Sequence, residues 1–166
     1  MSFTGNGKIP RKLLMHFVNV GTESEPEWER YGKGIEELTR EMNNNVESKT
    51  DITGETDVEV TKGNQTSSVS PFKARKESKL FQKLYKIYTD DLELDDVVME
   101  FLDVFISDEI SEGVYSAIKQ KGAIDLKSFG GPTSGIEMPF DINFLGEKEK
   151  GNFTASTKTY AKSTGV

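Results

Sequence analysis

The chain has 166 residues, about the length of one domain, and 34% of them are hydrophobic, 30% are charged and the formal net charge is −7. The acidic balance argues against a protein that grips nucleic acid, because that binding needs Lys and Arg to neutralise phosphates. The absence of cysteine excludes disulfides and thiolate metal sites. No apolar run approaches the roughly 20 residues of a membrane span, so we expect no membrane insertion.

The first part of the chain predicts an arm followed by short strands. Residues 1–10 are small and polar and end at a proline, which predicts an N-terminal arm. Strands are expected at 12–20 and 28–31, where apolar and β-branched residues alternate with polar ones. Residues 35–42 are ambiguous, because their composition favours a helix whereas their position between turns favours a strand.

The segment 46–70 consists mainly of Thr, Ser, Gly and charged residues. Val58 and Val60 alternate with acids before a turn signal at Lys62-Gly63-Asn64. As an isolated surface loop the segment would be unusually long. We therefore expect an extended loop or hairpin that reaches another molecule.

One helix is predicted, at 78–88, from apolar residues at helical spacing. The apolar stripe, which we expect to pack on the sheet, comprises Leu80, Phe81, Leu84, Ile87 and Tyr88. The opposite face is basic and includes Lys79, Lys83 and Lys86.

The remainder of the chain predicts strands. They are expected at 96–106, in one or two pieces over 114–129, and at 134–146, followed by a C-terminal strand and arm over 147–166 with the strand at 151–160. Pro139 lies in the middle of the strand expected at 134–146, where a central strand needs a backbone N–H. The whole pattern predicts a single, mainly β domain, a β-sandwich or partly closed β-barrel with one flanking α-helix.

No catalytic set, metal site or cofactor site is recognisable, so we do not expect an enzyme. The only histidine, His16, lies between Met15 and Phe17 and is expected to be a packed or edge residue. Ten acids follow Lys86 before the next basic residue, Lys119, but they match no calcium loop and nominate no glycosidase pair.

The charges are segregated along the chain. A basic stretch around the predicted helix is followed directly by the acidic run that includes Asp95 and Asp96. The plain interpretation is solvated surface. The sharper interpretation is self-complementarity, in which the basic helix of one copy faces the acidic segment of another.

The order of several short motifs resembles that of the major tail protein, or tail tube protein, family of long-tailed bacteriophages. The resemblance runs from residue 28 to residue 153 and rests on the order and spacing of the motifs together. Pro132 departs from the family pattern, which often has an acid after the paired glycines. The motifs are WERYGKGIEEL (28–38), DITG (51–54), PFKA (71–74), LFQKL (80–84), SFGG (128–131) and GNF (151–153).

The resemblance implies a structural virion protein. Such proteins form hexameric rings that stack into a hollow tail tube, the conduit for genome delivery, through which DNA passes without tight binding. The implied partners are copies of the chain itself and the tape-measure, tail terminator and distal tail proteins. The implied location is the phage tail in the virion, with assembly in the host cytoplasm.

This interpretation nominates two sets of residues. A net-negative wall would avoid holding DNA, so the lumen-lining candidates are Glu100, Asp103, Glu137 and Asp141. The candidates for contacts between subunits are Glu55, Asp57, Glu59, Lys62, Lys79, Lys83, Lys86, Asp95, Asp96 and Pro139.

Other functions stay open at this point. One alternative is a β-sandwich binding module, such as an adhesin or a carbohydrate binder. Another is a tube protein like those of type VI secretion systems. Size and shape in solution separate tubes and rings from a monomeric binding module.

Overall fold

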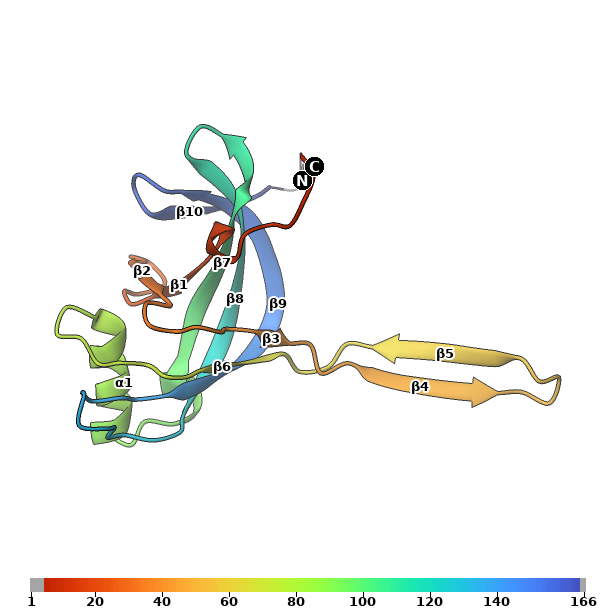
Figure 1. Ribbon diagram of the computed structural model, residues 1–166, viewed down its shortest axis with the longest axis horizontal. Coiled ribbons are helices and arrows are strands. Elements are labelled where there is room, and N and C mark those ends of the chain that lie inside the picture. Colours follow the sequence, from red (N-terminus) through yellow and green to blue (C-terminus); the bar gives the residue numbers. More distant parts are fainter. Residues whose placement is uncertain (1–4, 165–166) are drawn as a thin grey trace.

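A curved antiparallel sheet forms the centre of the structure, a computed structural model that describes residues 5–164 (Figure 1). Its strands follow the order β2-β1-β7-β8-β9-β6-β3, and β10 pairs with β9. Their bounds are β1 Leu14–Asn19, β2 Trp28–Tyr31, β3 Arg40–Glu41, β6 Thr66–Val69, β7 Val98–Ser111, β8 Val114–Leu126, β9 Phe140–Thr154 and β10 Thr159–Lys162. A second sheet is the hairpin of β4 Asn45–Thr50 and β5 Thr56–Thr61.

The described residues contain one α-helix, α1 Lys79–Thr89, and two short 3-10 turns, η1 Arg11–Leu13 and η2 Leu94–Val97. The expected class, mainly β with one flanking helix, is confirmed, and the arrangement is sandwich-like and not a closed barrel. No helix within residues 5–164 is both long enough and apolar enough to cross a membrane.

Both faces of the sheet carry a core, because successive side chains of a strand point to opposite faces. The larger core lies under α1, where Leu80, Leu84 and Ile87 pack with sheet residues such as Phe101 and Ile142. The smaller core lies on the other face. Its residues are Phe17, Trp28, Leu102, Val104, Ala117 and Phe153.

Curvature of the sheet closes the smaller core. The rings of Phe17 on β1 and Phe153 on β9 lie 4.6 Å apart, and Trp28 on β2 meets Tyr160 on β10 edge to face at 6.4 Å. Strands that are not neighbours in the sheet therefore approach one another over this face.

The helix begins where two side chains satisfy its free backbone N–H groups. The Ser78 hydroxyl accepts from the Phe81 N–H at 3.1 Å. The Glu29 carboxylate, on β2, accepts from the N–H groups of Lys79 and Leu80 at 2.9 and 3.2 Å. The helix position was predicted to within one residue, but one member of its stripe was wrong: Tyr88 is 50% exposed. It packs against Phe129, with ring centroids 4.7 Å apart, and not on the sheet.

The prediction of a strand over 134–146 with Pro139 inside it was also wrong. Strand β9 begins at Phe140, directly after the proline, and continues to Thr154. The Pro139 carbonyl still accepts from the Lys127 N–H at 3.0 Å, but the missing N–H lies outside the ladder. The alternation itself was correct from Met138 onward, since Met138, Phe140, Ile142 and Phe144 are all buried.

Other boundaries also differ from the expectations. The segment 35–42 is mostly irregular, with only Arg40–Glu41 in a strand, and 114–126 forms one continuous strand through Gly122. The final strand expected at 151–160 is divided between the end of β9 and β10, with a turn at 155–158. Of the two predicted arms, residues 1–4 and 165–166 lie outside the described residues, and residues 5–10 are exposed.

Candidate assembly interface

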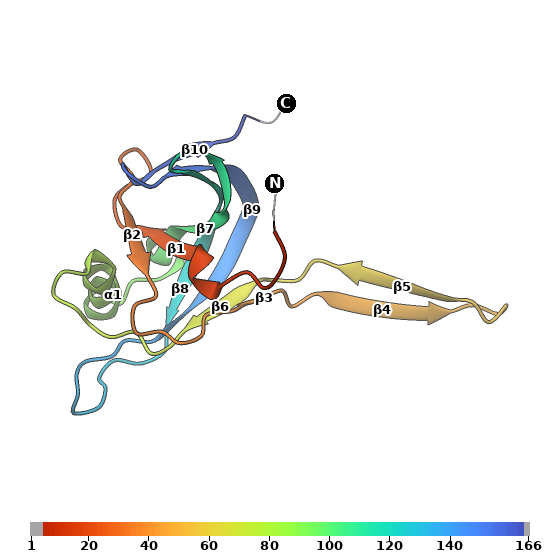
Figure 2. The same cartoon turned by 45° about the horizontal axis from the view of Figure 1, so that its top comes forward.

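The hairpin of β4 and β5 stands away from the rest of the molecule in both views (Figures 1 and 2). The segment expected as a loop or hairpin over 46–70 thus contains this hairpin and also β6, which belongs to the main sheet. Every residue from 45 to 61 is exposed. The strands pair in register from Asn45 opposite Thr61 to Thr50 opposite Thr56. Within residues 5–164, no side chain of the body buries either face.

The two faces of the hairpin differ in chemistry. Val46 lies opposite Val60 and Ser48 opposite Val58, which places the three valines on one face. These valines are 61–62% exposed. The charged face carries two cross-strand pairs, Glu47 with Glu59 and Lys49 with Asp57. Of the predicted contact residues, Asp57 and Glu59 therefore lie on this face, whereas Glu55 lies near the tip and Lys62 at the root.

An Asx-type turn forms the tip of the hairpin. The Asp51 carboxylate accepts from the Thr53 hydroxyl at 2.5 Å and from the backbone N–H groups of Thr53 and Glu55 at 2.8 and 3.2 Å. These hydrogen bonds, that of the Thr53 hydroxyl first, hold the pKa of Asp51 below its ordinary value. Gly54 takes the left-handed conformation with φ of 85°, which a glycine adopts without strain. At the apex Ile52 is fully exposed.

The root of the hairpin is fixed to the sheet by Arg40, which no sequence pattern had identified. Its guanidinium pairs with the Asp103 carboxylate at 2.9 Å, donates to the Gln120 side-chain oxygen at 2.9 Å, and lies 3.6 Å from the centre of the Phe144 ring. Beyond Arg40 the two segments that lead into the hairpin run very close together. A Cβ on Gly63 would lie 1.5 Å from the Asn43 carbonyl oxygen. These contacts attach the root of the hairpin to the main sheet and define where the hairpin leaves it.

The same network includes His16. Its Nδ1 lies 2.7 Å from the second Asp103 oxygen, and its Nε2 lies 2.8 Å from a guanidinium nitrogen of Arg11. Because a guanidinium only donates, Nε2 accepts and Nδ1–H donates to Asp103. The histidine thus links η1 and β1 to β7, in agreement with its expected packing role.

The predicted basic face of α1 is divided among different environments. Lys79 pairs with Glu27 of the same chain at 2.5 Å, and Lys83 is half-buried. Lys86 is exposed in the last turn, where a cation complements the helix dipole. Asp95 and Asp96 are exposed in η2. Whether these charges face another copy stays a prediction.

The lumen-lining candidates do not form one acidic surface. Glu100 and Asp103 lie three residues apart in β7, an odd spacing that points them to opposite faces of the strand. Each has a cation of its own chain, at 3.2 and 2.9 Å, respectively. Asp141 pairs with Lys127 at 3.3 Å. Glu137 lies before β9, where its backbone bridges to Lys73 and Gly130.

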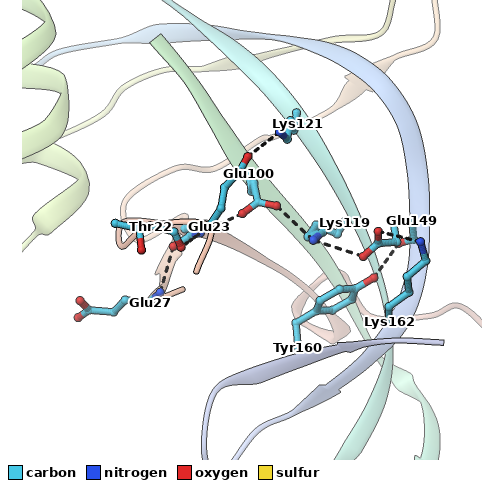
Figure 3. Close-up of polar contacts among 10 residues, drawn as sticks. Thr22, Glu23, Glu27, Glu100, Lys119, Lys121, Glu149, Tyr160 and Lys162 are labelled. Carbon is cyan, nitrogen blue, oxygen red and sulfur yellow. Dashed lines mark hydrogen bonds and ion pairs between the residues drawn. The ribbon is translucent and has the colours of Figure 1, made fainter. Parts of the chain in front are cut away.

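A row of alternating charges crosses four strands on the face that carries the smaller core (Figure 3). Lys119 on β8 lies 3.2 Å from Glu100 on β7 and 3.3 Å from Glu149 on β9, and Lys162 on β10 lies 3.3 Å from Glu149. Burial alone would lower the pKa of Lys119, but the two carboxylates raise it above its ordinary value. These ion pairs therefore connect neighbouring strands, and each charge in the row is balanced by an opposite charge beside it.

The described residues hold no cluster of three or more His, Cys, Asp or Glu side chains that could bind a metal ion. Compared with known proteins, the chain matches no family model and no curated protein. The projecting hairpin is therefore the feature of the molecule on which a functional argument rests.

Proposed function

We propose that this chain is a structural subunit that polymerises with copies of itself. In the form that the motif order favours, six copies close a ring and the rings stack into a phage tail tube, the conduit for genome delivery. The observation that carries the proposal is the hairpin from Asn45 to Thr61, which is exposed over its whole length and carries three valines on one face.

The hairpin has little tertiary support from its own domain. An isolated two-stranded hairpin is at best marginally stable in water, and among the described residues no side chain of the body buries this one. Its root is nevertheless held by the contacts of Arg40 and by the close approach of Gly63 to Asn43. A segment held in a fixed direction with an uncovered apolar face is suited to a contact with another molecule.

The sheet offers further surfaces for the same purpose. Strands β2 and β3 end the strand order of the main sheet, and among the described strands β2 pairs with β1 alone. Its outer edge thus presents backbone groups that another strand can pair with. Lateral contacts within a ring are consistent with such edges, and the hairpin serves contacts between rings.

The charge of the chain agrees with a conduit. With a net charge of −7, an assembled wall lacks the excess of Lys and Arg that would hold phosphates. In this proposal duplex DNA passes through without tight binding, and the protein resides in the virion. Salt-sensitive retention of duplex DNA by assembled tubes would contradict this part.

The test is assembly with and without the hairpin. The purified chain at high concentration should form rings or tubes in electron micrographs and sediment accordingly. Replacing residues 45–61 with two glycines should give a folded protein that no longer forms tubes. These limits spare Gln65 and Ser67, which are buried beside β9. A wild-type chain that stays monomeric, or tubes that form without the hairpin, would refute the proposal.

A further inference from the structure

The tip of the hairpin is a preformed apolar knob. Ile52 is fully exposed, yet the backbone beneath it is fixed by hydrogen bonds to the Asp51 carboxylate and by one from the Gly54 N–H to the Asp51 carbonyl at 3.1 Å. A turn whose backbone is already held this way loses little backbone freedom when its apex is buried in a contact. Acids at Asp51, Glu55 and Asp57, against Lys49, make the surroundings of the knob negative.

The body of the molecule carries a cavity with apolar walls and mainly basic charged residues, whereas the charges around the knob are mainly acidic. It has a volume of about 550 Å³ and lies between η1, β1, β2 and the loop 32–38. Leu14, Met15, Ile35 and Leu38 supply apolar walls. The charged residues around it are Arg11, Lys12, Arg30, Lys33 and a single acid, Glu36.

The structure also fixes the form of this cavity. The Arg11 guanidinium donates to the carbonyl of Leu14 at 2.9 Å and to that of Leu38 at 3.2 Å. It thereby holds one wall of the cavity, β1, against the other, the loop. The volume lies within the range of sites that bind small ligands, and it is large enough for one side chain with part of its turn.

We propose that Ile52 of one copy inserts into this cavity on a second copy, with the acids of the tip against the basic rim. The hairpin cannot serve its own cavity, because its tip points away from the body (Figures 1 and 2). Knob and cavity are different surfaces, so the contact is heterologous and repeats from copy to copy. This inference rests on the proposed function and names the surface that receives the hairpin.

Disulfide cross-linking tests the contact directly, because the chain has no cysteine of its own. The double variant Ile52→Cys with Ile35→Cys should give, on mild oxidation of assembled protein, a ladder of chains linked head to tail. The matched control is Ile52→Cys with Leu94→Cys, since Leu94 is 81% exposed on η2, away from the cavity. Equal ladders from the two pairs, or none from the first in tubes that do form, would overturn the inference.

Complementary variants give a second test. Ile52→Asp removes the knob, and Arg30→Glu with Lys33→Glu reverses the rim; all three residues are outside the core, so both variants should fold. Each variant alone should need at least about tenfold more protein to form tubes. When rings of each variant are formed separately and then mixed in equal amounts, they should pair once through the remaining knob and cavity and stop at particles no longer than two stacked rings. Leu94→Asp should assemble like the wild type.

The outcomes separate the two proposals. If wild-type tubes form and Ile52→Asp forms them equally well, the cavity is not the receiving surface and the proposed function stands. If the wild-type chain does not associate at any concentration, the proposed function fails and this inference fails with it.

Discussion

The helix α1 and the β4–β5 hairpin are both short amphipathic elements, but they use their apolar faces in opposite ways. The helix buries Leu80, Leu84 and Ile87 against the sheet of its own chain. The hairpin leaves Val46, Val58 and Val60 more than half exposed. Burial of the helix stripe stabilises the monomer, whereas burial of the hairpin valines can stabilise only a contact with another molecule.

This difference separates stability from assembly. Substitutions in the helix stripe should affect unfolding, and substitutions on the hairpin should affect association alone. Substitutions at the root of the hairpin should affect both stability and association. Arg40 contacts residues of the main sheet, and its position in the sequence is close to the start of the hairpin.

The largest effect on stability is expected from Leu84→Ala. Leu84 is fully buried, so the variant should lose about 2–5 kcal/mol of unfolding free energy in urea denaturation. Tyr88→Ala, on the same helix but half exposed, is the control and should cost less, within the roughly 0.5–1.5 kcal/mol of an aromatic pair. Equal losses would mean that the helix is not anchored by its buried stripe.

The next largest effect is expected from Arg40→Met, which keeps an apolar stem over Phe144 but removes the ion pair with Asp103 and the hydrogen bond to Gln120. Both charged side chains are mostly buried, at 15% and 19% exposure, so we expect a loss of about 1–3 kcal/mol. Amide exchange should accelerate in β3 and β6, which hold the hairpin root. The exposed Lys62→Met removes the same charge beside the root, and a similar effect there would disprove the clamp.

A smaller, pH-dependent effect is expected at Glu149. Burial alone would raise its pKa, but Lys119, Lys162 and Tyr160 lower it below its ordinary value. A depressed folded-state pKa contributes stability above the unfolded value of about 4.3, and this contribution is lost as the pH falls through the folded value. Glu149→Gln should therefore be less stable than the wild type at pH 7, and the gap should narrow below about pH 4. Urea denaturation across this range measures it, with the exposed Glu112→Gln as control.

The smallest effect on stability is expected from Val60→Thr on the hairpin. Val60 is 61% exposed and Thr suits a strand equally well, so the unfolding free energy should change by no more than about 0.5 kcal/mol. Tube formation, followed by light scattering, should nevertheless weaken. A monomer destabilised as strongly as by Leu84→Ala would show that the valines are covered within the chain.

Much of the fold could be predicted because it depends on local patterns. The helix was found from its spacing to within one residue, and the expected strands at 12–20 and 28–31 correspond to β1 and β2. Strand ends were less predictable. Pro139 lies just outside β9, because the ladder determines where a missing N–H is tolerated. Tyr88 fits the helical stripe, but in the fold it is half exposed and packs against Phe129, a residue distant in sequence.

The candidate interface was likewise predictable only in part. The DITG motif was visible in the sequence, and its Asp and Gly are typical of a tight turn, but nothing local showed that Ile52 stands at the end of an uncovered arm. Arg40 could not be found at all, since its partners Asp103, Gln120 and Phe144 are distant in sequence.

The sequence by itself therefore determined the class of the protein: a mainly β chain with one helix, an acidic charge and a polar segment too poor in apolar residues to fold on the body. Only the tertiary structure decided which acids remain free, because Glu100, Asp103 and Asp141 find cations from other strands. It also decided that the basic cavity and the acidic tip belong to different parts of the molecule. The physical reason is the range of the interactions: helical and strand periodicity acts over a few residues, whereas ion pairs and cavities join residues that only the folded sheet brings together.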